Sequence, residues 1–232
     1  MNFIDANRSL IGTGLYSPAE AARLTKVPTN RIRRWMQGYS RSYQGQQVFD
    51  PPLWHSEVPE IDGSLFLGFR DLIELRMIDG FRRQSISLPY IRKVVEAARR
   101  LVKDTHPFST TKFKTDGRKL FLEIVASTEE PQLIEILSGQ HTFHSIVSSG
   151  LQDIEFEADV ASLWRPSEGN REVVIDPLRS FGQPILDRYG VPTAAIERAH
   201  RSGRTLQQIT DDFEIDSRAF KAALRFEDSL AA

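Results

Sequence analysis

Three arginines and one asparagine lie within residues 30–34 of this 232-residue chain. Arginine and asparagine are the side chains that can read guanine and adenine edges with two hydrogen bonds, and they can equally bind phosphates. Residues 16–44 carry six Lys or Arg against one acidic residue, which favours a polyanionic partner. The candidate DNA-contacting residues are Lys26, Thr29, Asn30, Arg31, Arg33, Arg34, Arg41 and, as a phosphate contact, Tyr39.

Two short helices joined by a tight turn must position these side chains. In the first helix Ser17 is a suitable N-cap, and Glu20 lies three residues on, as a capping box requires. Pro18 suits the first helical position. The segment Lys26-Val27-Pro28 ends that helix, because a proline inside a helix costs about 3 kcal/mol. Thr29 is expected to cap the second helix.

The second helix is predicted to have one apolar face and one basic face. At about 100° per residue, Ile32, Trp35 and Met36 fall on the same side, and Asn30 and most of the arginines fall opposite. The simpler interpretation is a short amphipathic helix whose basic face is only solvated. The pairing of two helices and the local excess of positive charge favour a face that contacts DNA.

A wing and two further helices are predicted to follow. The edges of the loop over residues 40–67, Val48-Phe49 and Leu65-Phe66-Leu67, are expected to pair as the strands of the wing. A helix that begins at Phe69 carries apolar residues around most of its circumference, so it should be central or lie at an interface. Ser87 is then expected to cap another helix with an apolar inner side.

This order of elements resembles the winged helix-turn-helix of MerR-type regulators. The segments that carry the resemblance are Tyr16–Ala22, Ile32–Trp35, Asp71–Arg76 and Ser87–Arg92. The resemblance implies a DNA-binding domain over residues 1–105, with the second helix in the major groove and the wing at the backbone or minor groove. MerR-type regulators continue into a long dimerisation helix, whereas His106-Pro107-Phe108 ends the helix here, which counts against a MerR-type effector sensor.

Residues 106–170 are predicted to form a β-rich segment that lies at a subunit interface. Asp116-Gly117 is a hairpin signal between two of its predicted strands. The predicted elements are strands at Thr111–Lys114, Leu120–Val125, His141–Val147 and Ile154–Val160, and a short helix at Glu129–Leu137. Residues 120–160 carry eight acidic residues and no Lys or Arg, in contrast to the basic first half. This asymmetry suggests two partners on two surfaces, although acidic residues can also serve solubility alone.

Residues 171–232 are predicted to contain three short helices. One covers Pro192–His200, one follows Thr205, for which Gln208 completes a capping box, and one follows Asp216-Ser217. This part resembles the small three-helix domain of VapB-like antitoxins, which accompanies a PIN-like ribonuclease toxin. The matching residues are Gly182, Pro184, Val191-Pro192, Ile209, Asp212, Ala219 and Ala222-Ala223-Leu224.

The resemblance to antitoxins implies a way to neutralise the toxin. PIN-like nucleases hold a metal ion with carboxylates, so an inhibitor can insert an arginine as a competing cation. Arg165, Arg171 and Arg179 precede the helices and are the candidate toxin-binding residues. Each can equally be an ordinary solvated arginine. The helices over Thr205–Arg225 mix acidic and basic residues on the outside, which favours protein contact over DNA contact there.

Composition excludes several kinds of chemistry. The chain has no cysteine, which removes disulfides, thiolate catalysis and cysteine-based zinc sites. No apolar run approaches the length of a membrane span, so a cytoplasmic protein without a membrane partner is expected. His141 and His144 would point to opposite faces of a strand, and no metal, cofactor or enzymatic activity is predicted.

We predict an α+β fold, mostly α, with a winged helix-turn-helix domain (1–105), a β-rich dimerisation segment (106–170) and a three-helix, helix-turn-helix-like antitoxin-type domain (171–232). The expected function is that of a type II antitoxin. It would be a homodimer that binds operator DNA as an autorepressor and holds a PIN-like ribonuclease toxin in a higher-order complex. The alternative is a ligand-responsive regulator with the middle sheet as its sensor. An enzyme that uses middle-segment carboxylates or histidines is a third hypothesis, which no constellation of residues supports.

Overall fold

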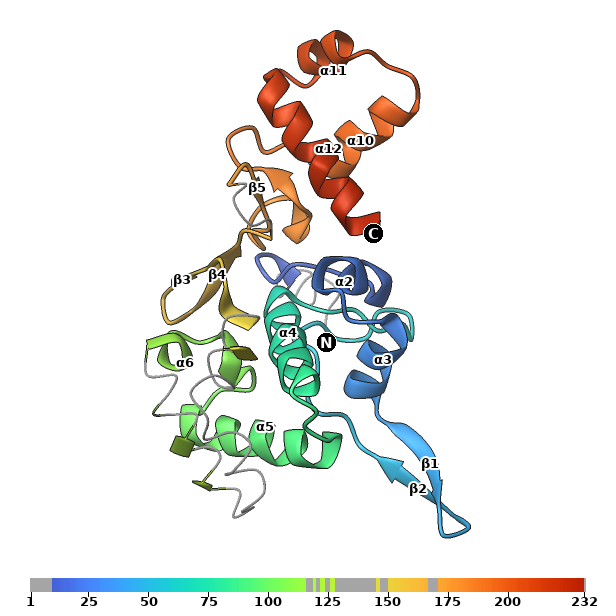
Figure 1. The fold of residues 1–232 in the computed structure, drawn as a ribbon, viewed down its shortest axis with the longest axis vertical. Helices are drawn as coiled ribbons and strands as arrows, with labels where there is room; N and C mark the ends of the chain where they lie inside the picture. Colours follow the sequence, from blue (N-terminus) through green and yellow to red (C-terminus); the bar gives the residue numbers. More distant parts are fainter. Residues whose placement is uncertain are drawn as a thin grey trace. The chain divides into compact units, whose positions relative to one another are not determined.

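The computed structural model describes residues 10–115, 119, 122–123, 126–127, 145–146, 150–166 and 171–231. These residues contain eight α-helices and three two-stranded sheets, which confirms the predicted α+β class (Figure 1). The chain divides into two compact units. The N-terminal unit is Ser17–Gln152 with Phe156–Ala161, and the C-terminal unit is Met1–Tyr16, Asp153–Glu155 and Ser162–Ala232. In the described part of the chain, no helix is long and apolar enough to cross a membrane.

Helix α2 (Pro18–Thr25) begins at the predicted capping box. Ser17 N donates to Glu20 Oε2 at 2.7 Å, and Glu20 N donates to Ser17 Oγ at 3.2 Å. The helix ends where Lys26 takes the left-handed conformation, with φ of 59°. Local residues therefore determine both ends of this helix.

Helix α3 (Thr29–Gln37) follows after a short turn and buries the predicted apolar face. Its buried residues are Ile32, Trp35 and Met36. The N-cap is Pro28, so the prediction that Thr29 caps this helix is wrong. The carbonyl of Pro28 accepts hydrogen bonds from the amides of Arg31 and Ile32, which makes Thr29 the first helical residue.

A β-hairpin follows α3 at the position of the predicted wing and is called the wing below. Its antiparallel strands β1 (Tyr39–Tyr43) and β2 (Gln46–Asp50) are joined by Gln44 and Gly45, both at positive φ as in a type I′ turn. The predicted pairing of Val48-Phe49 with Leu65-Phe66-Leu67 is therefore wrong, since Val48 pairs with Arg41. A two-residue turn closes at a lower entropic cost than the long loop that the predicted pairing requires.

Helices α4 (Phe69–Arg83) and α5 (Leu88–Val102) complete the winged part of the N-terminal unit. Helix α4 is buried around most of its circumference, as predicted. Ser87 occupies the N-cap position of α5 as predicted, although its side chain makes no capping hydrogen bond. The chain leaves the helix at Lys103 and continues into the 3-10 helix η1 (Pro107–Ser109).

The described residues after η1 are more helical than predicted. Helix α6 (Thr111–Thr115) replaces the predicted strand Thr111–Lys114, because Phe113 packs edge-on against Phe108 with ring centroids 5.0 Å apart. Leu122, Glu123, Ser145 and Ile146 are also helical, which contradicts the strands predicted over Leu120–Val125 and His141–Val147. Short apolar runs do not distinguish a strand from a buried helical segment. The residues of the predicted hairpin turn Asp116-Gly117 and of the predicted helix Glu129–Leu137, and both His141 and His144, lie outside the described residues.

The segment Ile154–Val160, predicted to be one strand, is divided between two strands. Strand β3 (Ile154–Glu157) is followed by Ala158 and Asp159, both at positive φ, and then by strand β4 (Val160–Trp164). The two strands form a two-stranded sheet. The turn therefore falls inside the segment for which the alternation of residues predicts a single strand.

The C-terminal unit contains a short antiparallel hairpin and the three predicted helices. The elements are β5 (Val173–Val174), the 3-10 helix η2 (Ser180–Gly182), β6 (Ile185–Leu186), α10 (Thr193–Arg201), α11 (Leu206–Asp212) and α12 (Ser217–Ala231). The predicted capping box of α11 is present, since Thr205 N donates to Gln208 Oε1 at 2.8 Å and Gln208 N donates to Thr205 Oγ1 at 3.3 Å. Ile196, Ile209 and Phe220 are buried, one from each helix.

Candidate nucleic-acid interface

The outer face of α3 presents the predicted polar residues to solvent. Asn30, Arg33 and Arg34 are exposed, whereas the opposite side of the helix is buried. Arg33 forms no hydrogen bond or ion pair with any described residue. The guanidinium of Arg34 stacks on Tyr39, with its central carbon 3.4 Å from the ring centroid. Arg33 and Arg34 therefore present positive charge that no described acidic side chain neutralises.

Arg31 differs from its neighbours because an acidic residue lies close to it. Its Nη1 atom is 3.8 Å from Asp79 Oδ1, and Arg83 Nε binds the other oxygen of the same carboxylate at 2.7 Å. Two arginines thus share one largely buried carboxylate at the side of α3. Two other predicted residues lie at helix ends, with Lys26 exposed at the C-cap of α2 and Thr29 half-buried at the start of α3.

The wing adds one further arginine, Arg41, along one face of β1. Tyr39, Arg41 and Tyr43 alternate along this strand and so share a face. Arg41 Nε donates to Asp50 Oδ2 at 2.6 Å, and the Arg41 guanidinium lies 5.3 Å from the centroid of the Tyr43 ring. This hydrogen bond raises the pKa of Arg41 and lowers the pKa of Asp50. A phosphate that approaches Arg41 must compete with Asp50.

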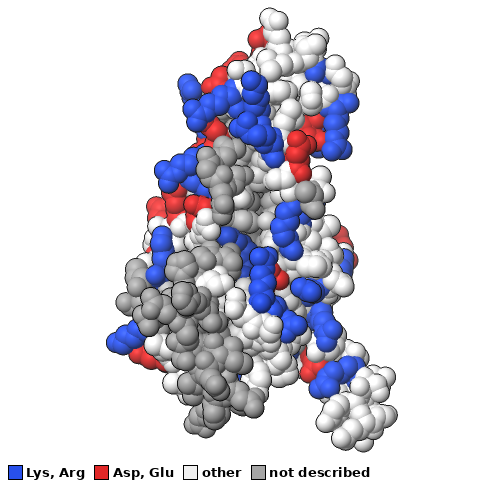
Figure 2. Space-filling view, viewed as in Figure 1, with Lys and Arg blue, Asp and Glu red and all other residues white. Residues whose placement is uncertain are grey.

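The tip of the wing carries no formal charge. Residues 42–49 contain no Lys, Arg, Asp or Glu, and Figure 2 shows an uncharged tip with charged side chains at its base. Tyr43 and Phe49 are 55% and 59% exposed there. These two aromatic residues and Asp50 were not among the residues predicted from the sequence. The alternation of Tyr39, Arg41 and Tyr43 was the signal that could have identified the strand.

Gly38 sets the direction in which the wing leaves α3. Its φ of 74° and ψ of −175° belong to a region that only glycine adopts readily. A Cβ atom at this position would lie 2.5 Å from the carbonyl oxygen of Asp50 and 2.7 Å from the ring of Phe49. The relative placement of α3 and the wing therefore depends on the absence of a side chain at Gly38.

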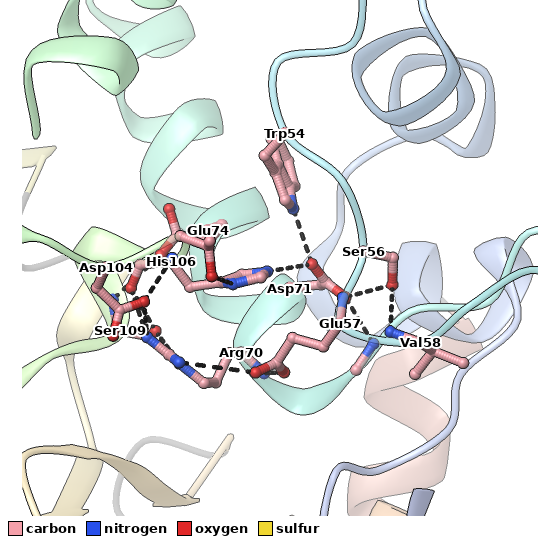
Figure 3. Close-up of polar contacts among 12 residues, drawn as sticks. Trp54, Ser56, Glu57, Val58, Arg70, Asp71, Glu74, Asp104, His106 and Ser109 are labelled. Atoms are coloured by element: carbon pink, nitrogen blue, oxygen red, sulfur yellow. Dashed lines mark hydrogen bonds and ion pairs between the residues drawn. The ribbon is translucent and has the colours of Figure 1, made fainter. Parts of the chain in front are cut away.

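A buried polar cluster holds the segment after the wing against α4 (Figure 3). Its centre is the carboxylate of Asp71, which is fully buried. Oδ1 is 2.8 Å from both Trp54 Nε1 and His106 Nε2. Oδ2 accepts hydrogen bonds from Ser56 Oγ and Gly68 N at 2.7 Å, and from Glu57 N at 3.2 Å. The cluster thereby holds residues 54–57, which follow the wing in the chain, against the start of α4.

The same cluster connects η1 to α4. Glu74 accepts the backbone amides of Phe108 at 2.9 Å and Ser109 at 3.2 Å, and burial raises its pKa to about 7. Burial lowers the pKa of His106, but the hydrogen bond to Asp71 and the neighbouring acidic charges outweigh this effect and raise the pKa overall. Two buried groups with raised pKa values therefore lie in the N-terminal unit.

Arg70 completes the cluster from the first turn of α4. Its Nη2 atom donates to Asp104 Oδ1 at 2.6 Å and to the carbonyl of His106 at 2.8 Å, and its Nε atom donates to Ser109 Oγ at 2.7 Å. In the part of the chain that the structure describes, no group of three or more His, Asp or Glu residues could hold a metal ion. We interpret the cluster as the support of the winged part.

The three arginines predicted to bind a toxin lie in the C-terminal unit in different surroundings. Arg165 Nη1 is 3.0 Å from Asp187 Oδ2, and Arg179 Nη1 is 2.8 Å from Asp187 Oδ1. Arg165 also donates to Glu155 Oε1 at 3.0 Å. The side chain of Arg171 is exposed and has no partner among the described residues. Partial burial raises the pKa of Asp187, but the hydrogen bonds from the two arginines outweigh it and lower the pKa overall.

Comparisons with known proteins cover both units. Residues 173–226 match a family described as "Protein of unknown function (DUF433)". The chain is 31% identical over 237 residues to "Putative antitoxin VapB45" of Mycobacterium tuberculosis strain H37Rv, and the alignment covers 94% of each chain. The X-ray crystal structure of Rv2018 from Mycobacterium tuberculosis matches with a TM-score of 0.70 at 28% identity, covering 92% of this chain and 99% of that chain.

Proposed function

The chain belongs to the VapB45 family of VapB-like antitoxins, and on that premise we propose that it neutralises a PIN-like ribonuclease toxin and represses its own operon. The N-terminal unit binds operator DNA and the C-terminal unit binds the toxin. A homodimer places two copies of α3 on two half-sites about one helical turn apart. The antitoxin acts in the cytoplasm by binding and needs no catalytic residue or cofactor.

The observation that carries the DNA-binding proposal is the outer face of α3. Arg33 and Arg34 are exposed there without an acidic partner among the described residues, beside Asn30 and next to the wing. Arginine can bind guanine with two hydrogen bonds or hold a phosphate. The stacking of Arg34 on Tyr39 restricts its guanidinium, which reduces the entropy lost on binding.

The double substitution Arg33→Ala with Arg34→Ala tests this proposal. We expect operator affinity to fall about 100-fold at fixed salt, because each bidentate contact contributes roughly 1–3 kcal/mol. The slope of the logarithm of affinity against the logarithm of salt should also decrease if phosphates are contacted. Fluorescence anisotropy with DNA from upstream of the operon measures both quantities. Arg100→Ala, an exposed arginine of α5, serves as the matched control. Unchanged affinity in the double variant contradicts the proposal.

For the toxin, Arg171 is the candidate that the geometry favours among the three arginines. It is exposed and unpaired among the described residues, whereas Arg165 and Arg179 are bound to Asp187. An unpaired guanidinium can replace a metal ion against the carboxylates of a nuclease at little cost, because no existing ion pair is broken.

Charge reversal separates these roles. We expect Arg171→Glu to weaken inhibition of the toxin at least about tenfold, which corresponds to roughly 1.4 kcal/mol. The assay is cleavage of a fluorogenic RNA by the nuclease from the neighbouring reading frame, titrated with the full-length antitoxin. Arg100→Glu on α5, exposed and in the N-terminal unit, is the control. If charge reversal at Arg165, Arg171 and Arg179 together leaves inhibition intact, the cation mechanism is wrong.

A further inference from the structure

Two adjoining hollows lie beside the end of α3 in the N-terminal unit and share His55 and Ser56 in their linings. The larger one has a volume of about 540 Å³, and its lining includes the apolar residues Met36, Val58 and Leu65 together with the exposed Glu60 at its edge. The smaller one, of about 300 Å³, is called the polar hollow below for its charged side chains and is lined by His55, Ser56, Glu57, Arg99, Thr105 and His106. Together they combine apolar side chains with the charge of Arg99, in a volume typical of small-molecule sites.

Arg99 is the side chain of the polar hollow that can bind an anionic ligand. Its Nε atom donates to the carbonyl of Thr105 at 3.1 Å, which anchors the guanidinium. Its two Nη atoms form no hydrogen bond or ion pair with any described residue. Arg99 is half-buried, and burial lowers its pKa. An anchored guanidinium with open N–H groups matches the two oxygens of a carboxylate.

The other charged groups of the polar hollow are already engaged. Glu57 accepts the amide of Arg70 at 3.2 Å and lies 3.7 Å from Arg70 Nη1. Burial raises the pKa of Glu57. His106 is bound to Asp71 through Nε2 and to Thr105 Oγ1 through Nδ1, at 2.8 and 3.1 Å. Arg99 is therefore the charged group of this lining that is open to a ligand.

We propose that these two hollows bind a small organic acid, with its carboxylate at Arg99 and its apolar body against Met36, Val58 and Leu65. The charge of Arg99 selects an anionic group, and the apolar side chains of the larger hollow select a hydrophobic body rather than an inorganic anion. His55, exposed at the junction, adds a hydrogen-bonding group. The buried cluster around Asp71 holds the polar hollow in place before the ligand arrives.

The position of the two hollows gives the ligand a regulatory consequence. Met36 and Gln37 belong to the last turn of α3 and line the larger hollow, so an occupant contacts the helix that carries Arg33 and Arg34. A ligand that binds one arrangement of this helix more tightly than another changes the affinity for DNA by that ratio. This consequence rests on the proposed operator binding, whereas the ligand site itself does not.

The ligand site is tested with 4-phenylbutyrate and octanoate on the full chain without DNA. Each acid has an apolar body and one carboxylate, and the uncharged amide of each is the matched control. Binding is measured by two-dimensional NMR titration. We expect a dissociation constant of about 1 mM or lower for at least one acid, with chemical-shift changes at the Trp54 indole N–H. The amide of that acid should bind about tenfold more weakly. Failure of both acids to bind, or equal binding of acid and amide, overturns the proposal.

Substitutions assign the carboxylate to Arg99. We expect Arg99→Gln to weaken binding of the acid about tenfold and to leave binding of the amide unchanged, and Arg100→Gln to change neither. An unaltered affinity of Arg99→Gln for the acid overturns the assignment. The wild-type comparison of acid with amide remains decisive if Arg99→Gln fails to fold.

The effect of the ligand on operator affinity is measured in a separate experiment from ligand binding. Operator affinity is measured with and without saturating acid, and a change of more than about threefold supports coupling to α3. A bound acid that leaves operator affinity unchanged overturns the coupling. Absence of operator binding without any acid overturns the proposed function instead, so the two failures are distinguishable.

Discussion

In the C-terminal unit Arg165 and Arg179 converge on Asp187, whereas in the N-terminal unit Arg33 and Arg34 have no acidic partner among the described residues. One carboxylate in each unit has a shifted pKa, and the two pKa values shift in opposite directions. Asp187 has two arginines and a lowered pKa, while Glu74 is buried against backbone amides and has a pKa of about 7. Arginine content alone therefore does not separate a binding surface from a structural one. The acidic groups within reach make the difference.

The largest effect predicted from this contrast is the pH dependence of the N-terminal unit. Because the folded pKa of Glu74 is raised to about 7, its protonated form stabilises the fold at lower pH, and this stability is lost as pH rises through about 7. The raised pKa of His106 acts in the same direction. Between about pH 5 and pH 8 we expect the free energy of unfolding to fall by up to about 3 kcal/mol.

Glu74→Gln tests this expectation, since glutamine keeps an acceptor for the amides of Phe108 and Ser109 and cannot ionise. Urea denaturation at several pH values should give a flatter profile for this variant than for the wild type. Glu96→Gln, at an exposed position of α5, should keep the wild-type slope. A wild-type profile that rises over the same range contradicts the raised pKa.

A second prediction concerns the paired arginines. Arg165→Ala with Arg179→Ala removes both partners of Asp187 and should cost about 2 kcal/mol of stability, less than for a fully buried pair because these side chains are partly solvated. Operator affinity should stay within about twofold of the wild type, because these residues are structural in this interpretation. Denaturation and anisotropy on the same preparation measure both. Loss of toxin inhibition without loss of stability would instead identify them as toxin contacts.

The contribution of Asp187 to stability should depend on pH in the opposite direction to that of Glu74. Its folded pKa is lowered, so its contribution to stability is complete above the ordinary pKa of the carboxyl and is lost as pH falls through the folded value. We expect Asp187→Asn to remove about 1 kcal/mol of this acid-side loss, an amount reduced by solvent screening. Unfolding experiments below about pH 4 compare it with Asp211→Asn, at an exposed position. Identical acid profiles for the two variants would exclude Asp187 as the titrating group.

The smallest predicted effect concerns Arg41 on the wing, which is exposed like Arg33 but paired with an acidic residue like Arg165. Asp50→Asn removes the negative charge that competes with phosphate for Arg41, so operator affinity should rise about threefold at low salt. The gain should disappear at high salt, where exposed charges are screened. Anisotropy at two salt concentrations is sufficient, with Asp62→Asn as the control at another exposed loop position. A decrease in affinity would show that Asp50 positions Arg41 for binding.

Features that depend on residues a few positions apart were predictable from the sequence. The capping boxes at Ser17 and Thr205 and the buried seam of α3 follow from side chains within one or two helical turns. The pairing of the wing strands is not predictable from apolar residues alone, because the two-residue Gln44-Gly45 turn sets their register. The prediction of a strand at Thr111–Lys114 is wrong. This segment has one large apolar residue, Phe113, so its hydrophobic pattern has no period that could distinguish a strand from a helix. The contact of Phe113 with Phe108 favours the helix.

Near neighbours in the chain thus specify the helices, their caps and the exposed basic face of α3, because propensity and periodicity act over one or two turns. The state of each charge depends on residues far away along the chain. Asp71 meets His106, Glu74 meets the amides after Pro107, and Arg165 meets Asp187 only after folding. Desolvation and Coulomb energy depend on distance in space, so folding decides which arginines are free to bind and at what pH the buried acids ionise.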